Sequence, residues 1–229
     1  MAVPRGDNGL MEEDEVDALI DENGVDYESD PELSSNLRDL AAAAQSGDVV
    51  ALRTAIDRLN GRVDEPLEDN DSALHLACLY GHLPCVQVSF ATRTLDSSCI
   101  YVNNSLMYLL QLLLERGANI EVKDEDEAIP LHDACAGAGY LEIVELLFSR
   151  ASGPECVKRM IETIDVEGDT PLHHAARGEH VNVIRFLLSS GALPTIKNSY
   201  GKTPGELADV NTDARRILEA AAIGNSLSS

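Results

Sequence analysis

Two histidines and two cysteines stand close together before the middle of the chain. His75, Cys78, His82 and Cys85 follow one another at spacings of three, four and three residues, and imidazole and thiolate groups are the ligands that structural zinc sites use. Those spacings would align all four side chains on one continuous helix. Gly81 interrupts that helix, however, and divides the set into two pairs on separate antiparallel segments. We therefore expect no zinc site here, and we place Cys78 at a small core position.

Histidines 75, 132 and 173 recur in similar surroundings and could suggest general-base catalysis. No serine or cysteine lies in a recognisable nucleophile elbow, and no glycine-rich phosphate-binding loop is present. A calcium loop around Asn23-Gly24 is also excluded, because counting back from the glycine puts Leu19 at the first ligand position. We predict a protein without catalytic activity, cofactor or metal.

These histidines belong to copies of one short pattern, and the elements that carry the copies must position them. The counterpart of His173 in the last copy is Glu206, 33 residues later, whereas the gaps between the three histidines are 57 and 41 residues. A recurring unit of this length indicates a stack of repeats, and the function of such a stack lies on the surface that it presents. The four copies are Asp71–Cys78, Ala128–Cys135, Asp169–Ala176 and Gly201–Ala208.

The copies resemble the ankyrin repeat, which has a period of 33 residues and the signature Thr-Pro-Leu-His. Residues 170–173 match that signature fully, and the resemblance covers residues 36–222, with a further likeness to a small acidic ankyrin-repeat protein of plants. It implies an all-α ankyrin solenoid of helix-turn-helix units with short β-hairpin tips, in which the signature histidine hydrogen-bonds to backbone near the tip. It also implies that partners bind to the tips and to the groove lined by the first helices. The variable positions of those helices are here Leu76, Leu79, Tyr80, Asp133, Ala136, His174, Arg177 and Glu179.

Local signals support the same unit independently of the resemblance. A Thr or Ser before Pro-Leu-His supplies a helix N-cap, and proline suits the first helical position. Gly117 and Gly191 follow the second helices, where a left-handed C-cap favours glycine. About five units fit the chain, including atypical end units at Asn36–Pro66 and Thr203–Ala222, since an end unit exposes one face to water.

The 57-residue gap holds 24 residues more than one period. Removing Val88–Gln111 restores an ordinary second helix, so the insertion interrupts a helix and not a surface loop. Every Val codon begins with GT and one Gln codon ends with AG, so one hypothesis is a retained intron arising from alternative splicing. The other hypothesis is a functional loop. In either case, Leu106–Leu110 can extend backwards from Leu112–Leu114 as a replacement helix.

A shorter insertion explains the 41-residue gap. One extra residue lies in Ala136–Ala138 and seven lie within Ser149–Thr163. Ser152-Gly153-Pro154-Glu155 is typical of a helix start, and we predict an additional short helix that ends at Glu162.

The chain is strongly acidic, with 40 Asp or Glu residues, 17 Lys or Arg residues and a net charge of −23. This charge argues against binding to nucleic-acid phosphates or to an anionic membrane, and it favours a protein partner with a basic surface. Residues 1–35 alone hold 12 acidic residues and one basic residue. We predict that they form a disordered acidic tail, and that residues 223–229 form a second disordered tail.

The five cysteines are an odd number, which indicates reduced thiols in an intracellular protein. The chain has no apolar run long enough for a membrane span, and its N-terminus lacks the pattern of a signal peptide. We expect a monomer in the cytoplasm, the nucleus or both.

Acidic residues recur on three consecutive tips, so stacking would align them as one acidic edge. We predict a non-catalytic adaptor or regulatory scaffold whose charge sets its association rate. The alternative is an acidic chaperone or assembly factor for a basic client such as histones or ribosomal proteins. The tip acids that we assign to partner binding are Asp69 and Asp71, then Glu121, Asp124, Glu125 and Asp126, then Asp165 and Glu167, and Glu127 and Asp169 add to the negative charge of the same tips.

Overall fold

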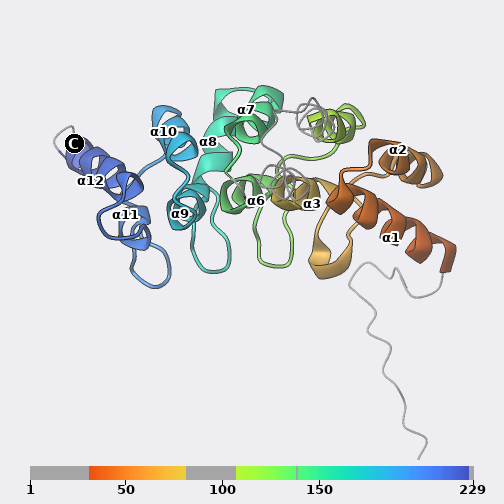
Figure 1. Ribbon diagram of the computed structural model, residues 1–229, viewed down its shortest axis with the longest axis horizontal. Coiled ribbons are helices and arrows are strands. Elements are labelled where there is room, and N and C mark those ends of the chain that lie inside the picture. The colour runs from red at the N-terminus through yellow and green to blue at the C-terminus, as the bar shows by residue number, and fades with distance from the viewer. Residues whose placement is uncertain (1–30, 81–106, 138, 227–229) are drawn as a thin grey trace, which may run out of the picture.

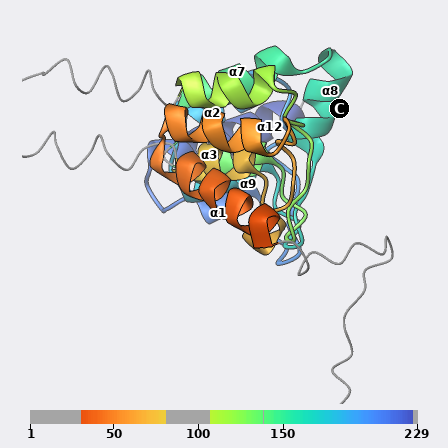
Figure 2. The ribbon, with the colours of Figure 1, turned by 90° about the vertical axis from the view of Figure 1, so that its right-hand side faces the viewer.

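The computed structural model describes residues 31–80, 107–137 and 139–226. Residues 1–30, residues 88–106 of the insertion, the pair His82 and Cys85, and the last three residues lie outside this part of the chain. The described residues form an elongated stack of helices in two layers, with loops projecting along one side (Figures 1 and 2). The predicted all-α stack of repeats is confirmed.

The first helices of the repeats form the inner layer, and each packs against the next along the array. Helix α3 contacts α1 and α6, and α9 contacts α6 and α11. The layer consists of α1 (Pro31–Ser46), α3 (Ala73–Tyr80), α6 (Pro130–Ala136), α9 (Pro171–Arg177) and α11 (Pro204–Leu207).

The second helices form the outer layer, each beside the first helix of its own unit. Thus α2 packs on α1, α7 on α6, α10 on α9 and α12 on α11. The helix at residues 107–115 lies between α2 and α7 in this layer (Figure 1). The labelled members are α2 (Val49–Arg58), α7 (Leu141–Arg150), α10 (Val181–Ser189) and α12 (Asp213–Ser226).

The inner helices begin where the sequence supplies a reciprocal cap. In α9 the backbone N–H of Thr170 donates to Nδ1 of His173 at 3.0 Å, and Pro171 occupies the first helical turn. In α11 the backbone N–H of Thr203 donates to the carboxylate of Glu206 at 2.9 Å. A backbone donor that the helix cannot satisfy is thus paired at the start of each helix.

Both insertions produce helices where they were expected. Leu109, Leu110 and Leu113 are fully buried, so the predicted replacement helix is confirmed at residues 107–115. Helix α8 (Pro154–Glu162) has the predicted start and end, and it buries Cys156, Met160 and Ile161 against the stack.

Three details differ from the expectation. No strand occurs in the described residues, because each tip is a tight turn closed by one backbone hydrogen bond, for example from the Asp165 N–H to the Asp169 carbonyl at 3.1 Å. Helix α1 begins at Pro31 and not at residue 36, since proline suits a first helical position. Helix α12 continues to Ser226, four residues beyond the expected end of the array, through an alanine-rich stretch that favours helix.

The described cysteines Cys78, Cys135 and Cys156 are free and buried. Within the described residues, no helix combines the length and the apolar character needed to cross a bilayer.

Candidate functional site

The repeat histidines join each repeat to the next one. Nδ1 of His75, His132 and His173 accepts a backbone N–H at the start of its own helix, at 3.0 to 3.1 Å. With Nδ1 acting as an acceptor, Nε2 carries the proton and donates it across the repeat boundary. The accepting carbonyl oxygens belong to Ala128, Asp169 and Lys202, at 3.2, 3.3 and 3.2 Å.

Burial keeps these imidazoles neutral. It lowers the pKa of His75 and His173, and it lowers the pKa of His132 to about 4. Since both nitrogens of each ring are engaged and the rings are buried, these side chains hold the scaffold and are poorly placed to act as general bases.

The tips are also joined to one another through the backbone. The Glu125 N–H donates to the Asp69 carbonyl at 3.3 Å, and the Val166 N–H donates to the Asp126 carbonyl at 2.9 Å. The Ser199 N–H continues the row by donating to the next carbonyl, that of Glu167, at 2.9 Å. The tips therefore form one continuous edge along the stack, and they lie almost behind one another in the view along the array (Figure 2).

Most of the predicted tip acids lie on this edge. Asp69, Glu125, Asp126 and Glu167 are exposed, while Asp71, Asp124 and Asp165 are half-buried. We name the four exposed residues the acidic edge.

Glu121 does not belong to the acidic edge. Its two carboxylate oxygens accept from Nε and Nη2 of Arg159 on α8, at 2.9 and 3.0 Å, and one of them also accepts from the thiol of Cys156 at 3.4 Å. The hydrogen bonds from Arg159 lower the pKa of Glu121. The sequence did not predict this ion pair, which the inserted helix α8 makes possible by supplying a basic partner.

The fourth tip reverses the charge of the edge. It carries Lys197 and Lys202, both exposed, and Asn198 takes the position that Asp165 has on the tip before it. The prediction overlooked this change of sign, although reading the tip charges one repeat further would have found it.

Acidic side chains gather between the second and third repeats, and the ion pairs of the described residues include none of Asp71, Asp124 and Asp133. Burial, together with the charges of Asp124, Asp69 and other tip acids, raises the pKa of Asp71 to about 6. Burial and the charges of Asp71 and Asp124 raise the pKa of Asp133 well above its ordinary value. Oδ2 of Asp133 is buried and has no hydrogen-bond partner.

The next repeat balances its acids internally. Nε2 of His174 pairs with the carboxylate of Asp165 at 2.8 Å, and the buried carboxylate of Asp169 pairs with the guanidinium of Arg177. Burial opposes ionisation of Asp165, but hydrogen bonds from His174 and the Asp169 N–H outweigh it and lower the pKa of Asp165. Nδ2 of Asn198 donates to the second oxygen of Asp169 at 2.7 Å.

The variable positions of the inner helices divide into exposed and internal residues. Leu79 and Tyr80 are each 37% exposed, and Ala136 and Arg177 are exposed as well. Leu76 is only 6% exposed, so its assignment to a partner surface is wrong, because it packs inside the stack.

Two further variable positions support the repeat array. The ring of His174 lies edge-on to that of His132, with centroids 5.4 Å apart. Oε1 of Glu179 accepts the backbone N–H of Asp209 at 2.7 Å and so connects the fourth repeat to the fifth.

Comparison with known proteins adds the following findings. The family model described as "Ankyrin repeats (3 copies)" matches residues 98–198 and 150–222, and the model described as "Ankyrin repeat" matches residues 69–88. A transient receptor potential cation channel subfamily A member 1 homolog of Caenorhabditis elegans is 34% identical over 131 residues, which are 56% of this chain and 10% of that protein.

Two more relatives show similar identity. The probable 26S proteasome regulatory subunit p28 of Saccharomyces cerevisiae is 31% identical over 129 residues, or 51% of this chain and 53% of that protein. The "Ankyrin repeat, SAM and basic leucine zipper domain-containing protein 1" of Dasypus novemcinctus is 31% identical over 154 residues, or 62% of this chain and 30% of that protein. The chain thus spans between a tenth and about half of the length of these relatives.

Proposed function

Because this chain belongs to the ankyrin-repeat family, whose repeats are in general protein-interaction modules and not catalysts, we propose that it is an adaptor or regulatory scaffold for a protein with a basic surface. The free, buried cysteines favour a reducing compartment, the cytoplasm or the nucleus.

The continuous acidic edge is the observation that carries this proposal. Asp69, Glu125, Asp126 and Glu167 are exposed on consecutive tips, and backbone hydrogen bonds between the tips hold them in register. A charged row that is already ordered costs little conformational entropy on binding, and it attracts a basic partner during encounter.

The inner helices provide the shorter-range contacts beside that row. Leu79 and Tyr80 offer apolar and aromatic surface, and aromatic residues are common anchors of protein interfaces. Arg177 contributes a positive group, which Asp169 and Glu167 orient. The row of tips changes from negative to positive at Lys197. A partner with a basic surface and an acidic end would therefore bind in one orientation along the stack.

The experiment compares two variants of equal net charge in the full chain. The edge variant carries Asp69→Asn, Glu125→Gln, Asp126→Asn and Glu167→Gln. The control variant removes four exposed acids from the outer side and α8. These substitutions are Glu115→Gln, Glu142→Gln, Glu145→Gln and Glu162→Gln.

Partners are first isolated by affinity purification with the parent chain, and their Kd is then measured at several salt concentrations. We expect the edge variant to weaken binding about tenfold, from four surface charges worth roughly 0.3 kcal/mol each, and to flatten the salt dependence. Equal affinity of the two variants for the isolated partner would refute the role of the acidic edge.

A second candidate function rests on the acidity of the N-terminal segment. Residues 1–30 hold 11 acidic residues and one basic residue, a composition suited to shielding a basic client. Deleting residues 1–30 leaves α1 intact, since that helix begins at Pro31. An adaptor keeps its partner after this deletion, whereas an acidic chaperone or assembly factor loses it.

A further inference from the structure

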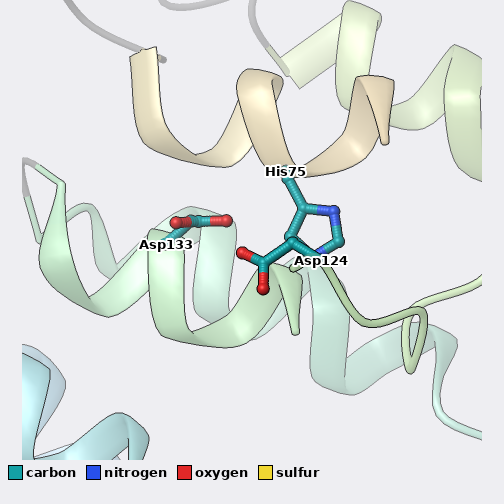
Figure 3. A group of neighbouring side chains, drawn as sticks. All are labelled: His75, Asp124 and Asp133. Carbon is teal, nitrogen blue, oxygen red and sulfur yellow. The ribbon is translucent and has the colours of Figure 1, made fainter. Parts of the chain in front are cut away.

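We infer that His75, Asp124 and Asp133 form a binding site for one divalent metal cation of the Mn²⁺ class, between the second and third repeats. One ligand atom from each of these side chains lies within 4.8 Å of the others. Figure 3 shows them gathered from three elements, with His75 on α3, Asp124 on the tip loop and Asp133 on α6. Ligand atoms about 2.1 Å from a shared ion stand at most about 4.2 Å apart, so a small inward movement completes the site.

Asp133 gives independent support for a ligand. Its Oδ2 is buried without a hydrogen-bond partner, although a buried carboxylate oxygen normally has one. Among the described residues, no basic side chain forms an ion pair with Asp133 or Asp124. Oδ1 of Asp124 accepts the Ala128 N–H at 2.8 Å, which leaves its second oxygen available.

In the next repeat, the positions that correspond to Asp124 and Asp133 hold an acid together with a basic partner. Asp165 corresponds to Asp124 and His174 corresponds to Asp133, and there the two side chains form a pair at 2.8 Å. One repeat further, the positions hold the uncharged Asn198 and Leu207. Among these three pairs of positions, both residues are acidic at Asp124 and Asp133, and the ion pairs of the described residues give neither of them a basic partner. A cation from outside the chain can supply that positive charge.

The fourth repeat also provides an internal comparison. Asp165, Asp169 and His174 bring their ligand atoms equally close together. Their carboxylates are already bound by His174, Arg177 and Asn198, so we expect no metal there.

His75 can supply a nitrogen by changing tautomer. Its Nδ1 lies 2.9 Å from the hydroxyl of Ser72, and the hydroxyl oxygen can accept a hydrogen bond from a protonated Nδ1 when Nε2 binds the metal. A metal-bound histidine commonly donates its other N–H in this way. The cost is two hydrogen bonds, the one from Nε2 to the Ala128 carbonyl at 3.2 Å and the one from the Ser72 N–H to Nδ1 at 3.1 Å.

The ligand set selects the class of ion. One imidazole nitrogen and two carboxylate oxygens suit Mn²⁺ or Zn²⁺ better than Ca²⁺, which prefers oxygen alone. A small ion also matches the burial of Oδ2, because the guanidinium of a partner protein would have to reach an oxygen that has no exposed surface. Mn²⁺ is the better probe in this chain, since Zn²⁺ would also bind its thiols.

The test uses the full chain after removal of metals with a chelator, without any partner. Mn²⁺ is titrated and its binding is followed by electron paramagnetic resonance and by the thermal midpoint. The variant Asp133→Leu removes the ligand and is expected to fold, because Leu76 and Leu207 occupy the same position in other repeats. Asp133→Asn keeps the shape of the side chain, and Glu145→Gln matches the change in charge on exposed α7 surface.

We expect one site in the parent chain and in Glu145→Gln, with a rise in Tm of about 5 °C at a hundredfold excess over Kd. Both Asp133 variants should weaken this site by at least about tenfold and lose the rise. Equal Mn²⁺ binding by parent and Asp133→Leu would overturn the inference, as would the absence of a saturable site. A rise in Tm with Nα-acetyl-arginine amide that depends on Asp133, without any response to Mn²⁺, would overturn it in favour of a partner's basic side chain.

Discussion

The negative charge of Asp71 destabilises the folded protein, so replacing this aspartate by a neutral residue should increase the free energy of unfolding. Its pKa rises from the ordinary value of 3.8 to about 6, chiefly through burial and then through the charges of Asp124 and other tip acids. Two pKa units correspond to about 3 kcal/mol at most. Since Asp71 is only half-buried, solvent screening reduces the figure, and we expect Asp71→Asn to raise the free energy of unfolding by about 1 kcal/mol at pH 8.

The pH dependence gives this prediction its sharpest form. A carboxyl whose pKa is higher in the folded state binds more protons when folded, so its charge costs stability above the folded pKa and costs nothing below the unfolded value. The gain from Asp71→Asn should therefore be full above about pH 6, about half as large at pH 5, and absent below about pH 4.

The assay is urea unfolding followed by far-UV circular dichroism at pH 8 and pH 5, with Glu145→Gln as the control. Glu145 is exposed on α7, so its neutralisation should change the free energy of unfolding little at either pH. A gain for Asp71→Asn that is equal at both pH values, or larger at pH 5, would refute the electrostatic reasoning.

The other predictions concern contacts within and between the repeats. His132 has a pKa of about 4 in the folded chain and an ordinary value of 6.5, so its neutral form stabilises the fold above about pH 6.5, and up to about 3 kcal/mol is lost as the pH falls to 4. Replacing His132 by Leu should thus cost about 2 kcal/mol in urea unfolding at pH 7.5, from two lost hydrogen bonds, and clearly less at pH 5. A Cβ on Gly178 would lie 2.3 Å from the ring of His180, so Gly178→Ala should lower stability by about 1–3 kcal/mol in thermal unfolding. Gly205→Ala on α11, whose Cβ would meet only ordinary contacts from Leu218 and Glu219 of α12, should be neutral or stabilising by about 0.5 kcal/mol. The side chain of Asn198 makes three hydrogen bonds at the fourth tip, and Asn198→Ala should cost about 2–3 kcal/mol in urea unfolding.

Contrary results would identify which step of the reasoning fails. If the cost of His132→Leu does not depend on pH, the imidazole titrates alike in the folded and unfolded chains. If Gly178→Ala is as well tolerated as Gly205→Ala, the ring of His180 moves aside without penalty.

Much of the fold could be predicted because the same local sequence signals, such as helix starts, occur once in each of several repeats. The pattern around Thr170-Pro171 defines a helix start. Because this pattern recurs along the chain, it predicted the first helices that form the inner layer. The start of α8 at Pro154 followed from a Gly-Pro pair with an acid behind it. Such features depend on neighbours in sequence, so they need no knowledge of the stack.

The features that the sequence did not predict depend on contacts between elements that lie far apart along the chain. Leu76 belongs to the same family of positions as Asp133, yet it is buried while Asp133 is half-buried. Glu121 turns to Arg159, 38 residues away, because α8 is an addition to the standard unit. The gathering of acids around Asp133 follows from the register of the stack, which a pattern within one repeat does not define.

The joints between repeats also bear on how such a chain can change over generations. Each repeat histidine donates to a main-chain carbonyl of the next unit, and the residues that provide those carbonyls are an alanine, an aspartate and a lysine. The joint therefore places no demand on the side chain of the neighbour. Duplication, loss or exchange of a whole unit by recombination leaves every joint able to form, so the number of repeats can drift while the acids on the tips remain free to diverge.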